Sequence, residues 1–150
     1  MAQSPSQRGT GTPEGLPSTL KQVSRNDHFT ILLDERRGLI HTIRSDKPFS
    51  SLEELEVAFG ELGATLDGLG RARYALLCDI RAAPGRNDPQ FEAALQRVRP
   101  RWISGFRRVG VLVKSVVGQL QIQRYARQDG IKRLITNDED ELLKYLTQED

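Results

Sequence analysis

Apolar runs of strand length alternate with helix-length segments from Phe29 onward, and this alternation restricts the fold more than any single motif. Two runs, 29–35 and 39–44, flank a turn at Arg36-Arg37-Gly38 and predict an antiparallel hairpin. The runs at 73–80, 108–113 and 132–136 are each preceded and followed by a helix-length segment. Because helical crossovers join parallel strands, we predict an α/β fold of order β-β-α-β-α-β-α-β-α, with a mixed, mostly parallel, five-stranded sheet.

The first predicted helix, over residues 52–69, has the clearest pattern. Ser51 and Glu54 have the spacing of a capping box, in which a hydroxyl and a carboxylate satisfy free backbone amides. Six large apolar residues recur at steps of three and four and therefore share one face, namely Leu52, Leu55, Phe59, Leu62, Leu66 and Leu69. Such a face is typical of a helix that packs on a core.

The two following helices are less plainly marked. Asp88-Pro89 resembles an N-cap with proline at the first helical position, and Pro100 is expected to kink or split the helix that follows. Residues 116–129 fit either a strand or a helix, and we predict a helix because Gly130 is a suitable C-cap. Residues 137–146 supply a last helix with an acidic first turn.

The beginning of the chain differs in composition from the rest. Residues 1–26 are rich in Ser, Pro, Gly, Thr and Gln and have few apolar positions, so we predict a disordered tail followed by a domain over 27–150. The N-terminus lacks the apolar block of a signal peptide, and no apolar run is long enough to span a membrane. A single cysteine, Cys78, cannot form an internal disulfide. These features predict a cytoplasmic protein.

Charge is unevenly distributed, although the formal net charge is only +2. From Arg71 to Arg133 there are fourteen Lys or Arg residues and four Asp or Glu residues. Such an excess suits an anionic partner or neutralises acidic segments of the same fold. The arginines at 97, 99, 101, 107 and 108 have Trp102 and Phe106 among them, but no recognised nucleic-acid-binding module accompanies them. Nucleic acid is therefore not the expected partner.

Three segments resemble the STAS/SpoIIAA-like proteins, namely Leu76-Leu77-Cys78-Asp79-Ile80-Arg81, Pro84-Gly85-Arg86-Asn87-Asp88-Pro89 and Val109-Gly110-Val111-Leu112-Val113. Taken with the element order, the likeness is closest to small bacterial stand-alone members grouped with CRAL-TRIO-type lipid-binding folds. The anti-anti-sigma branch carries a phosphorylatable Ser or Thr after the third strand. Here no Ser, Thr or Tyr lies between Asp79 and Phe91. The resemblance implies the scaffold and a regulatory or binding role, without that kinase switch.

The loop after the third predicted strand is the candidate site. Ligands of α/β sheets bind beyond the carboxyl ends of strands, and free backbone amides at a helix N-terminus favour anions. The candidate ligand- or partner-binding residues are Asp79, Arg81, Arg86, Asn87 and Asp88. In one interpretation Arg81 and Arg86 hold an anion; in the other, Arg81 pairs with Asp79 or Asp88 and the loop is only a turn.

A phosphoacceptor site like that of receiver domains is a further interpretation. It would need Asp34, Glu35 and Asp79 to converge on Mg²⁺. A hairpin, however, stands where a receiver has its first helix, so no metal site is expected. We also expect no cofactor, no catalytic residue in the two histidines or Cys78, and no enzymatic activity.

Two functions remain open from the sequence. The leading prediction is a STAS-like regulatory or scaffolding module that binds a protein partner. The alternative is a carrier or sensor of a small acidic or lipid-like ligand, which the CRAL-TRIO kinship and the positive charge favour. The sequence does not specify the oligomeric state.

Overall fold

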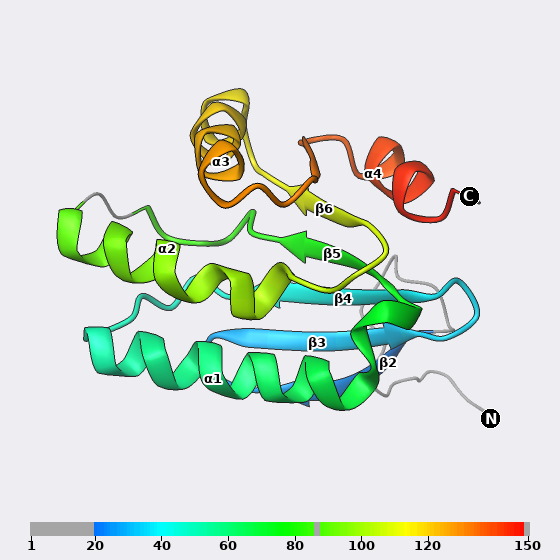
Figure 1. The fold of residues 1–150 in the computed structure, drawn as a ribbon, viewed down its shortest axis with the longest axis horizontal. Coiled ribbons are helices and arrows are strands. Elements are labelled where there is room, and N and C mark those ends of the chain that lie inside the picture. The colour runs from blue at the N-terminus through cyan, green and yellow to red at the C-terminus, as the bar shows by residue number, and fades with distance from the viewer. Residues whose placement is uncertain (1–19, 86–87, 149–150) are drawn as a thin grey trace, which may run out of the picture.

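The computed structural model describes residues 20–85 and 88–148, which form one mixed sheet with helices on both faces (Figure 1). The elements in chain order are β2 (Lys21–Arg25), β3 (Phe29–Asp34), β4 (Leu39–Arg44), α1 (Leu52–Leu69), a short 3₁₀ helix (Arg71–Arg73), β5 (Ala75–Asp79), α2 (Pro89–Ile103), β6 (Val109–Leu112), α3 (Val116–Asp129), β7 (Leu134–Thr136) and α4 (Glu139–Leu146).

The six strands follow one another across the sheet in chain order, β2-β3-β4-β5-β6-β7. The β2–β3 and β3–β4 pairs are antiparallel, whereas β4–β5, β5–β6 and β6–β7 are parallel. The hairpin turn uses Gly38 at a φ of 65°, a left-handed conformation that glycine adopts without strain. The predicted α/β class and mostly parallel sheet are therefore confirmed, with six strands in place of five.

The additional strand, β2, corrects the predicted disordered tail. Residues 1–26 are predicted to be disordered, yet Lys21–Arg25 pairs with β3, and Lys21 lies opposite Leu33. This strand is at the edge of the sheet and its side chains are mostly exposed, so it needs no apolar pattern that the sequence could reveal. Residues 1–19 of the predicted tail lie outside the described residues.

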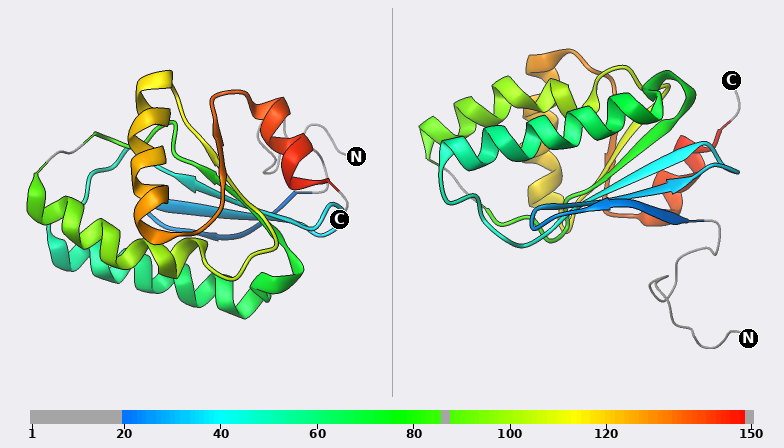
Figure 2. Two further views of the ribbon diagram at one scale, coloured as in Figure 1. Left: turned by 45° about the horizontal axis from the view of Figure 1, so that its top comes forward. Right: turned by 90° about the horizontal axis from the view of Figure 1, so that it is seen from below.

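Two apolar cores lie on opposite faces of the sheet, which the right-hand view of Figure 2 shows nearly edge-on. Helices α1 and α2 cover one face, where their apolar residues pack on alternate residues of β3, β4, β5 and β6. Helix α4 covers the other face through Leu142 and Leu146, which join Leu39, Leu77 and Leu112. Helix α3 stands beside β7 and α2.

Local sequence explains the helix ends. The Ser51 hydroxyl accepts a hydrogen bond from the Glu54 amide at 3.0 Å, whereas the Glu54 carboxylate accepts from the Ser50 amide rather than completing a capping box. The Asp88 carboxylate caps α2 through the Phe91 amide at 2.8 Å. Pro100 does not split α2, because a single helix continues through it to Ile103. The other predicted effect, a kink at Pro100, stays a prediction. Among the described residues no helix is long and apolar enough to cross a bilayer.

Candidate functional site

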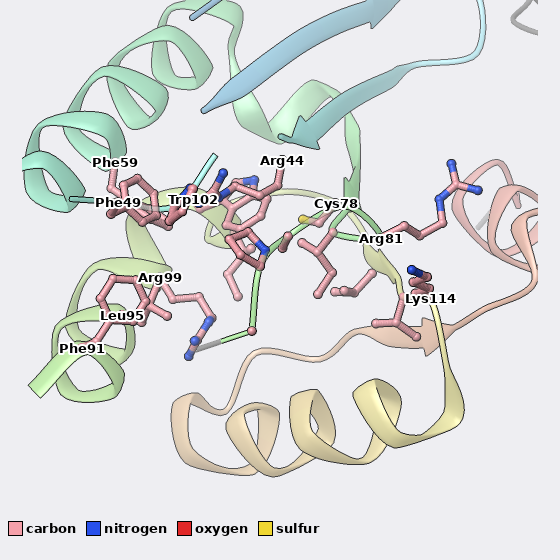
Figure 3. Close-up of a pocket in the computed structure, with 18 of the residues that line it drawn as sticks. Arg44, Phe49, Phe59, Cys78, Arg81, Phe91, Leu95, Arg99, Trp102 and Lys114 are labelled. Atoms are coloured by element: carbon pink, nitrogen blue, oxygen red, sulfur yellow. The ribbon is translucent and has the colours of Figure 1, made fainter. Parts of the chain in front are cut away.

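A cavity of about 340 Å³ opens at the carboxyl ends of the central strands, on the face covered by α1 and α2 (Figure 3). Its walls come from the ends of β4, β5 and β6, from the loops that follow them, and from α2. This is the edge where α/β sheets bind ligands, because loops diverge there and leave a crevice. The volume lies near the lower end of the roughly 300–1,000 Å³ common for small-molecule sites.

The lining of this cavity combines apolar side chains with cations and contains no carboxylate among its described members. Aromatic and aliphatic residues form most of the wall, including Phe49, Phe59, Phe91, Leu95, Trp102, Ile103, Val111 and Val113. The cations are Arg44, Arg81, Arg99, Lys114 and Arg133. An apolar chamber with a positive lining favours ligands that carry both an apolar part and a negative group.

Arg44, the last residue of β4, is a buried cation of the lining. No described carboxylate forms an ion pair with it. Alternation along β4 places Ile40, Thr42 and Arg44 on the face toward α1 and α2. The Arg44 side chain is buried, and its guanidinium lies 4.4 Å from the centre of the Phe49 ring. Figure 3 shows Arg44 beside Phe49 and Trp102 at one end of the cavity.

The Arg44 guanidinium is in direct contact with polar and aromatic groups, and the charge of Asp46 favours its cationic form from beyond ion-pairing distance. Its Nη1 donates to the Ser45 carbonyl oxygen at 2.7 Å and to the Ser45 hydroxyl at 3.3 Å. Among the described residues no carboxylate lies within ion-pairing distance of the guanidinium. Burial lowers the pKa of Arg44 from 12.5 to about 10, so the group is still a cation at neutral pH. Burying a cation without an ion-pair partner costs free energy, and a bound anion would lower that cost.

Arg81, by contrast, is already neutralised. Its Nε and Nη2 donate to the two carboxylate oxygens of Asp79 at 3.0 and 2.7 Å, a bidentate arrangement. Its Nη1 lies 3.7 Å from the Glu139 carboxylate at the start of α4. The hydrogen bonds that Arg81 donates to Asp79 raise the pKa of Arg81 above its ordinary value. Figure 3 shows the Arg81 side chain extending away from the aromatic group of the cavity.

The remaining cations differ in position and partners. Arg133 is almost wholly buried and donates through Nη2 to Asp129, the last residue of α3. Lys114 is exposed where β6 leads into α3, and Arg99 lies on α2 beside Leu95. Arg133 therefore shapes the wall, whereas Lys114 adds positive charge at the rim.

Of the five predicted site residues, the structure places three. Asp79 and Arg81 form the ion pair just described. This agrees with the second interpretation of the loop, in which Arg81 pairs with a neighbouring carboxylate and does not hold an anion. Asp88 caps α2. Arg86 and Asn87 lie outside the described residues. The predicted loop does border a cavity, since Arg81 and Gly85 line it, but Arg44 was missed.

Arg44 could have been recognised from one pattern. The strand Leu39-Ile-His-Thr-Ile-Arg alternates, so Arg44 shares a face with Ile40, which lies in the core. That pattern predicts a buried arginine at a strand end. The sequence does not show that Phe49 returns across its guanidinium, because this depends on the path of the 45–51 loop.

The cavity wall beside Arg44 holds an inert thiol and a hydrogen-bonded tryptophan. Trp102 Nε1 donates to the Thr42 hydroxyl at 2.9 Å, and that hydroxyl donates to the Leu77 carbonyl oxygen. Burial raises the pKa of Cys78 to about 12, so its thiol is protonated and unreactive at neutral pH. Trp102 is thus a buried wall residue, not an exposed surface for stacking bases.

The residues of the receiver-like interpretation do not gather. Asp34 accepts from Arg37 at 2.7 Å, while Asp79 binds Arg81. Within residues 20–85 and 88–148, no three His, Cys, Asp or Glu side chains are grouped as a metal site would need. The basic residues of α2 are also partly neutralised, since Arg97 and Arg101 both pair with Glu56 of α1.

Comparison with known proteins bears on the fold. No protein-family model matches the chain, and no curated protein matches it in sequence. A solved structure of an uncharacterized protein from Shewanella loihica PV-4, described as a member of the DUF3478 family with a SpoIIAA-like fold, superposes with a TM-score of 0.58 at 16% identity. The match covers 83% of this chain and 98% of that one. The chain therefore has a SpoIIAA-like fold, as the three resembling segments imply.

Proposed function

We propose that this protein binds a small amphipathic anion in the cavity at the carboxyl ends of β4, β5 and β6. The observation that carries the proposal is Arg44, a buried guanidinium that lines an apolar cavity and has no carboxylate partner among the described residues. An anionic head at Arg44 would supply that partner, and an apolar tail would cover the aromatic wall. Such a ligand corresponds to the alternative function predicted from the sequence, a carrier or sensor of a small acidic or lipid-like ligand.

The lining supports binding rather than chemistry. Acid–base catalysis needs a group whose pKa lies near the working pH, most often a histidine or a carboxylate. The described lining contains neither, and its one thiol has a pKa of about 12. We therefore place the protein among carriers and sensors. The predicted role as a protein-binding regulatory module stays a prediction, because it has no comparable observation behind it.

The proposal is tested with a matched pair of probes, octanoate and octan-1-ol, which share a tail and differ in charge. Calorimetric titration is expected to show tighter binding of octanoate. Arg44→Gln is expected to weaken octanoate by about tenfold or more, since a hydrogen bond to a charged group contributes roughly 1.5–3 kcal/mol. The same variant should change octan-1-ol affinity by about twofold at most, because the apolar wall is intact.

The matched control is Arg97→Gln on α2. Arg97 pairs with Glu56 and does not line the cavity, so octanoate affinity should be unchanged. Arg44→Met, which fills similar space without charge, repeats the test if the Gln variant unfolds. Equal affinities for the two probes, or octanoate binding that survives both Arg44 substitutions, would overturn the proposal.

A further inference from the structure

Helix α3 presents an exposed apolar pair that no described part of the chain covers. Val117 is 77% exposed and Leu120 is 62% exposed, the two largest values among the described large apolar residues. Their spacing of three residues places them side by side on one face of the helix. Exposing two adjacent apolar side chains is unfavourable in water, so this face fits a partner that removes them from solvent.

Cations precede and follow this pair along the chain. Arg124 and Arg127 follow Leu120 at steps of four and three, are exposed, and so continue the face toward the end of the helix. Lys114 is exposed just before the helix begins. No Asp or Glu occurs from residue 114 to residue 128. We name Lys114, Val117, Leu120, Arg124 and Arg127 the α3 face.

Helix α1 differs from α3 in the charges that accompany its exposed apolar residues. It also exposes apolar side chains, Leu52 at 41% and Val57 at 55%. Its exposed surface, however, carries Glu53, Glu61 and Asp67. The two helices lie on opposite sides of the molecule in Figure 1. An anionic surface would therefore attract the α3 face and repel the exposed surface of α1.

We propose that the α3 face docks reversibly on an anionic membrane surface, with Val117 and Leu120 entering the headgroup boundary and the three cations contacting lipid headgroups. Amphipathic helices with cations on their polar side bind such interfaces without spanning them. Each cation near an anionic leaflet adds a modest attraction that fades with salt. The affinity of such binding is the sum of a few weak contacts, so a face of only five residues can supply it.

Two other occupants fit the face less well. A stable protein interface needs roughly 1,000 Å² or more with an apolar centre, which two side chains do not supply. A second copy joined through the same face would gather the cations of both copies in one contact that has no acidic residue, because a two-fold contact uses the same patch twice. Like charges would then oppose the association.

The location of the α3 face connects it with the cavity. Lys114 and Ser115 line the cavity, and α3 begins at the next residue. Figure 3 shows α3 running beside the cavity from Lys114. A membrane on the α3 face would lie near the cavity rim, where amphipathic anions dissolved in the bilayer are available. The docking itself rests on the α3 face and not on the ligand.

The test is flotation of the whole protein with phosphatidylcholine vesicles and with vesicles containing equal parts phosphatidylcholine and phosphatidylglycerol. We expect binding to the anionic vesicles at 0.1 M salt, weaker binding at 0.5 M salt, and none to neutral vesicles. The double variant Val117→Gln/Leu120→Gln should lower the partition coefficient by about tenfold or more. Arg124→Gln/Arg127→Gln should lower it and reduce its salt dependence.

The matched control is Leu52→Gln/Val57→Gln on α1, which changes the same two residue types to glutamine and should bind anionic vesicles like the unaltered protein. Absence of flotation with anionic vesicles, or equal loss in the α1 and α3 variants, would overturn the proposal. So would a dimer in sedimentation analysis that the α3 variant abolishes. Arg44→Gln should leave flotation unchanged, so failure of this proposal and failure of ligand binding are distinguishable.

Discussion

The two faces of the sheet differ in how tightly they are packed, even where the same strands supply both. On the α4 face a Cβ added at Gly110 would lie 2.3 Å from Leu142 Cδ1, so a single methyl group has no room. On the opposite face Val111, the next residue of β6, lines a cavity of about 340 Å³. Residues that are neighbours in β6 thus face a filled core on one side and, on the other, a cavity at the strand ends where α/β sheets bind ligands.

Strand β4 carries the same contrast in charge. Arg44 on the cavity face keeps its positive charge at neutral pH, because its pKa falls only to about 10. His41 points to the opposite face, where burial lowers its pKa to about 4, and its Nε2 has no hydrogen-bond partner among the described residues. Burial lowers both pKa values by a similar amount, so the two groups differ in charge because arginine is much the stronger base. At neutral pH the cavity face therefore holds a buried cation, whereas the opposite face holds a neutral imidazole.

The largest effect that tests this contrast is the pH dependence of His41. In the unfolded chain its pKa is 6.5, so as the pH falls below 6.5 the unfolded state binds a proton that the folded state takes up only near pH 4. The free energy of unfolding should therefore decrease between these values. Between pH 7 and pH 4.5, urea titrations should show the unaltered protein losing about 2–3 kcal/mol more than His41→Leu. Parallel losses in both proteins would show that His41 can be charged in the folded state.

The next effect concerns the closely packed face. Gly110→Ala forces Leu142 to move and should lower the free energy of unfolding by about 1–3 kcal/mol, as overpacking does in well-filled cores. Chemical denaturation at neutral pH measures the change. Because Gly110 faces Leu142, on the side of the sheet opposite the cavity, octanoate binding by the folded protein should be retained. An unchanged stability would mean that the α4 face has room to adjust.

The smallest expected change in stability comes from filling the cavity. Leu95→Trp adds far more volume than Gly110→Ala, but Leu95 lines the cavity, so the free energy of unfolding should change by less than about 1 kcal/mol. Octanoate binding should be lost, because the larger ring occupies the ligand space. A destabilisation as large as that of Gly110→Ala would indicate that the cavity is not available space.

Much of this fold is predictable from the sequence, because its strands and helices carry strong periodic patterns. The apolar face of residues 52–69 and the cap at Ser51 predict α1, and the structure confirms the cap and the face except for Leu52, which is exposed. Residues 116–129 are ambiguous in pattern and form the helix that Gly130 favours. Strand β2 is not predictable in this way, since the edge strand is held by backbone pairing and its sequence, Lys-Gln-Val-Ser-Arg, has little apolar signal.

The site is only partly predictable. Its position after the third predicted strand follows from a general property of α/β sheets, and Arg81 does line the cavity. Which arginine is neutralised depends on contacts between distant segments. Arg81 is balanced by Asp79 and also by Glu139, fifty-eight positions later in the chain. Arg44 is enclosed by Phe49 through the path of a loop.

The account rests on Arg44 as the group that receives an anion inside the cavity. The most direct measurement is a crystal structure of the protein with 8-bromooctanoate, in which anomalous scattering from bromine locates the tail. We predict the carboxylate within hydrogen-bonding distance of Arg44 and the bromine among the apolar residues of the cavity. A cavity that stays empty, or a carboxylate bound at Arg81 with its tail in solvent, would contradict the account.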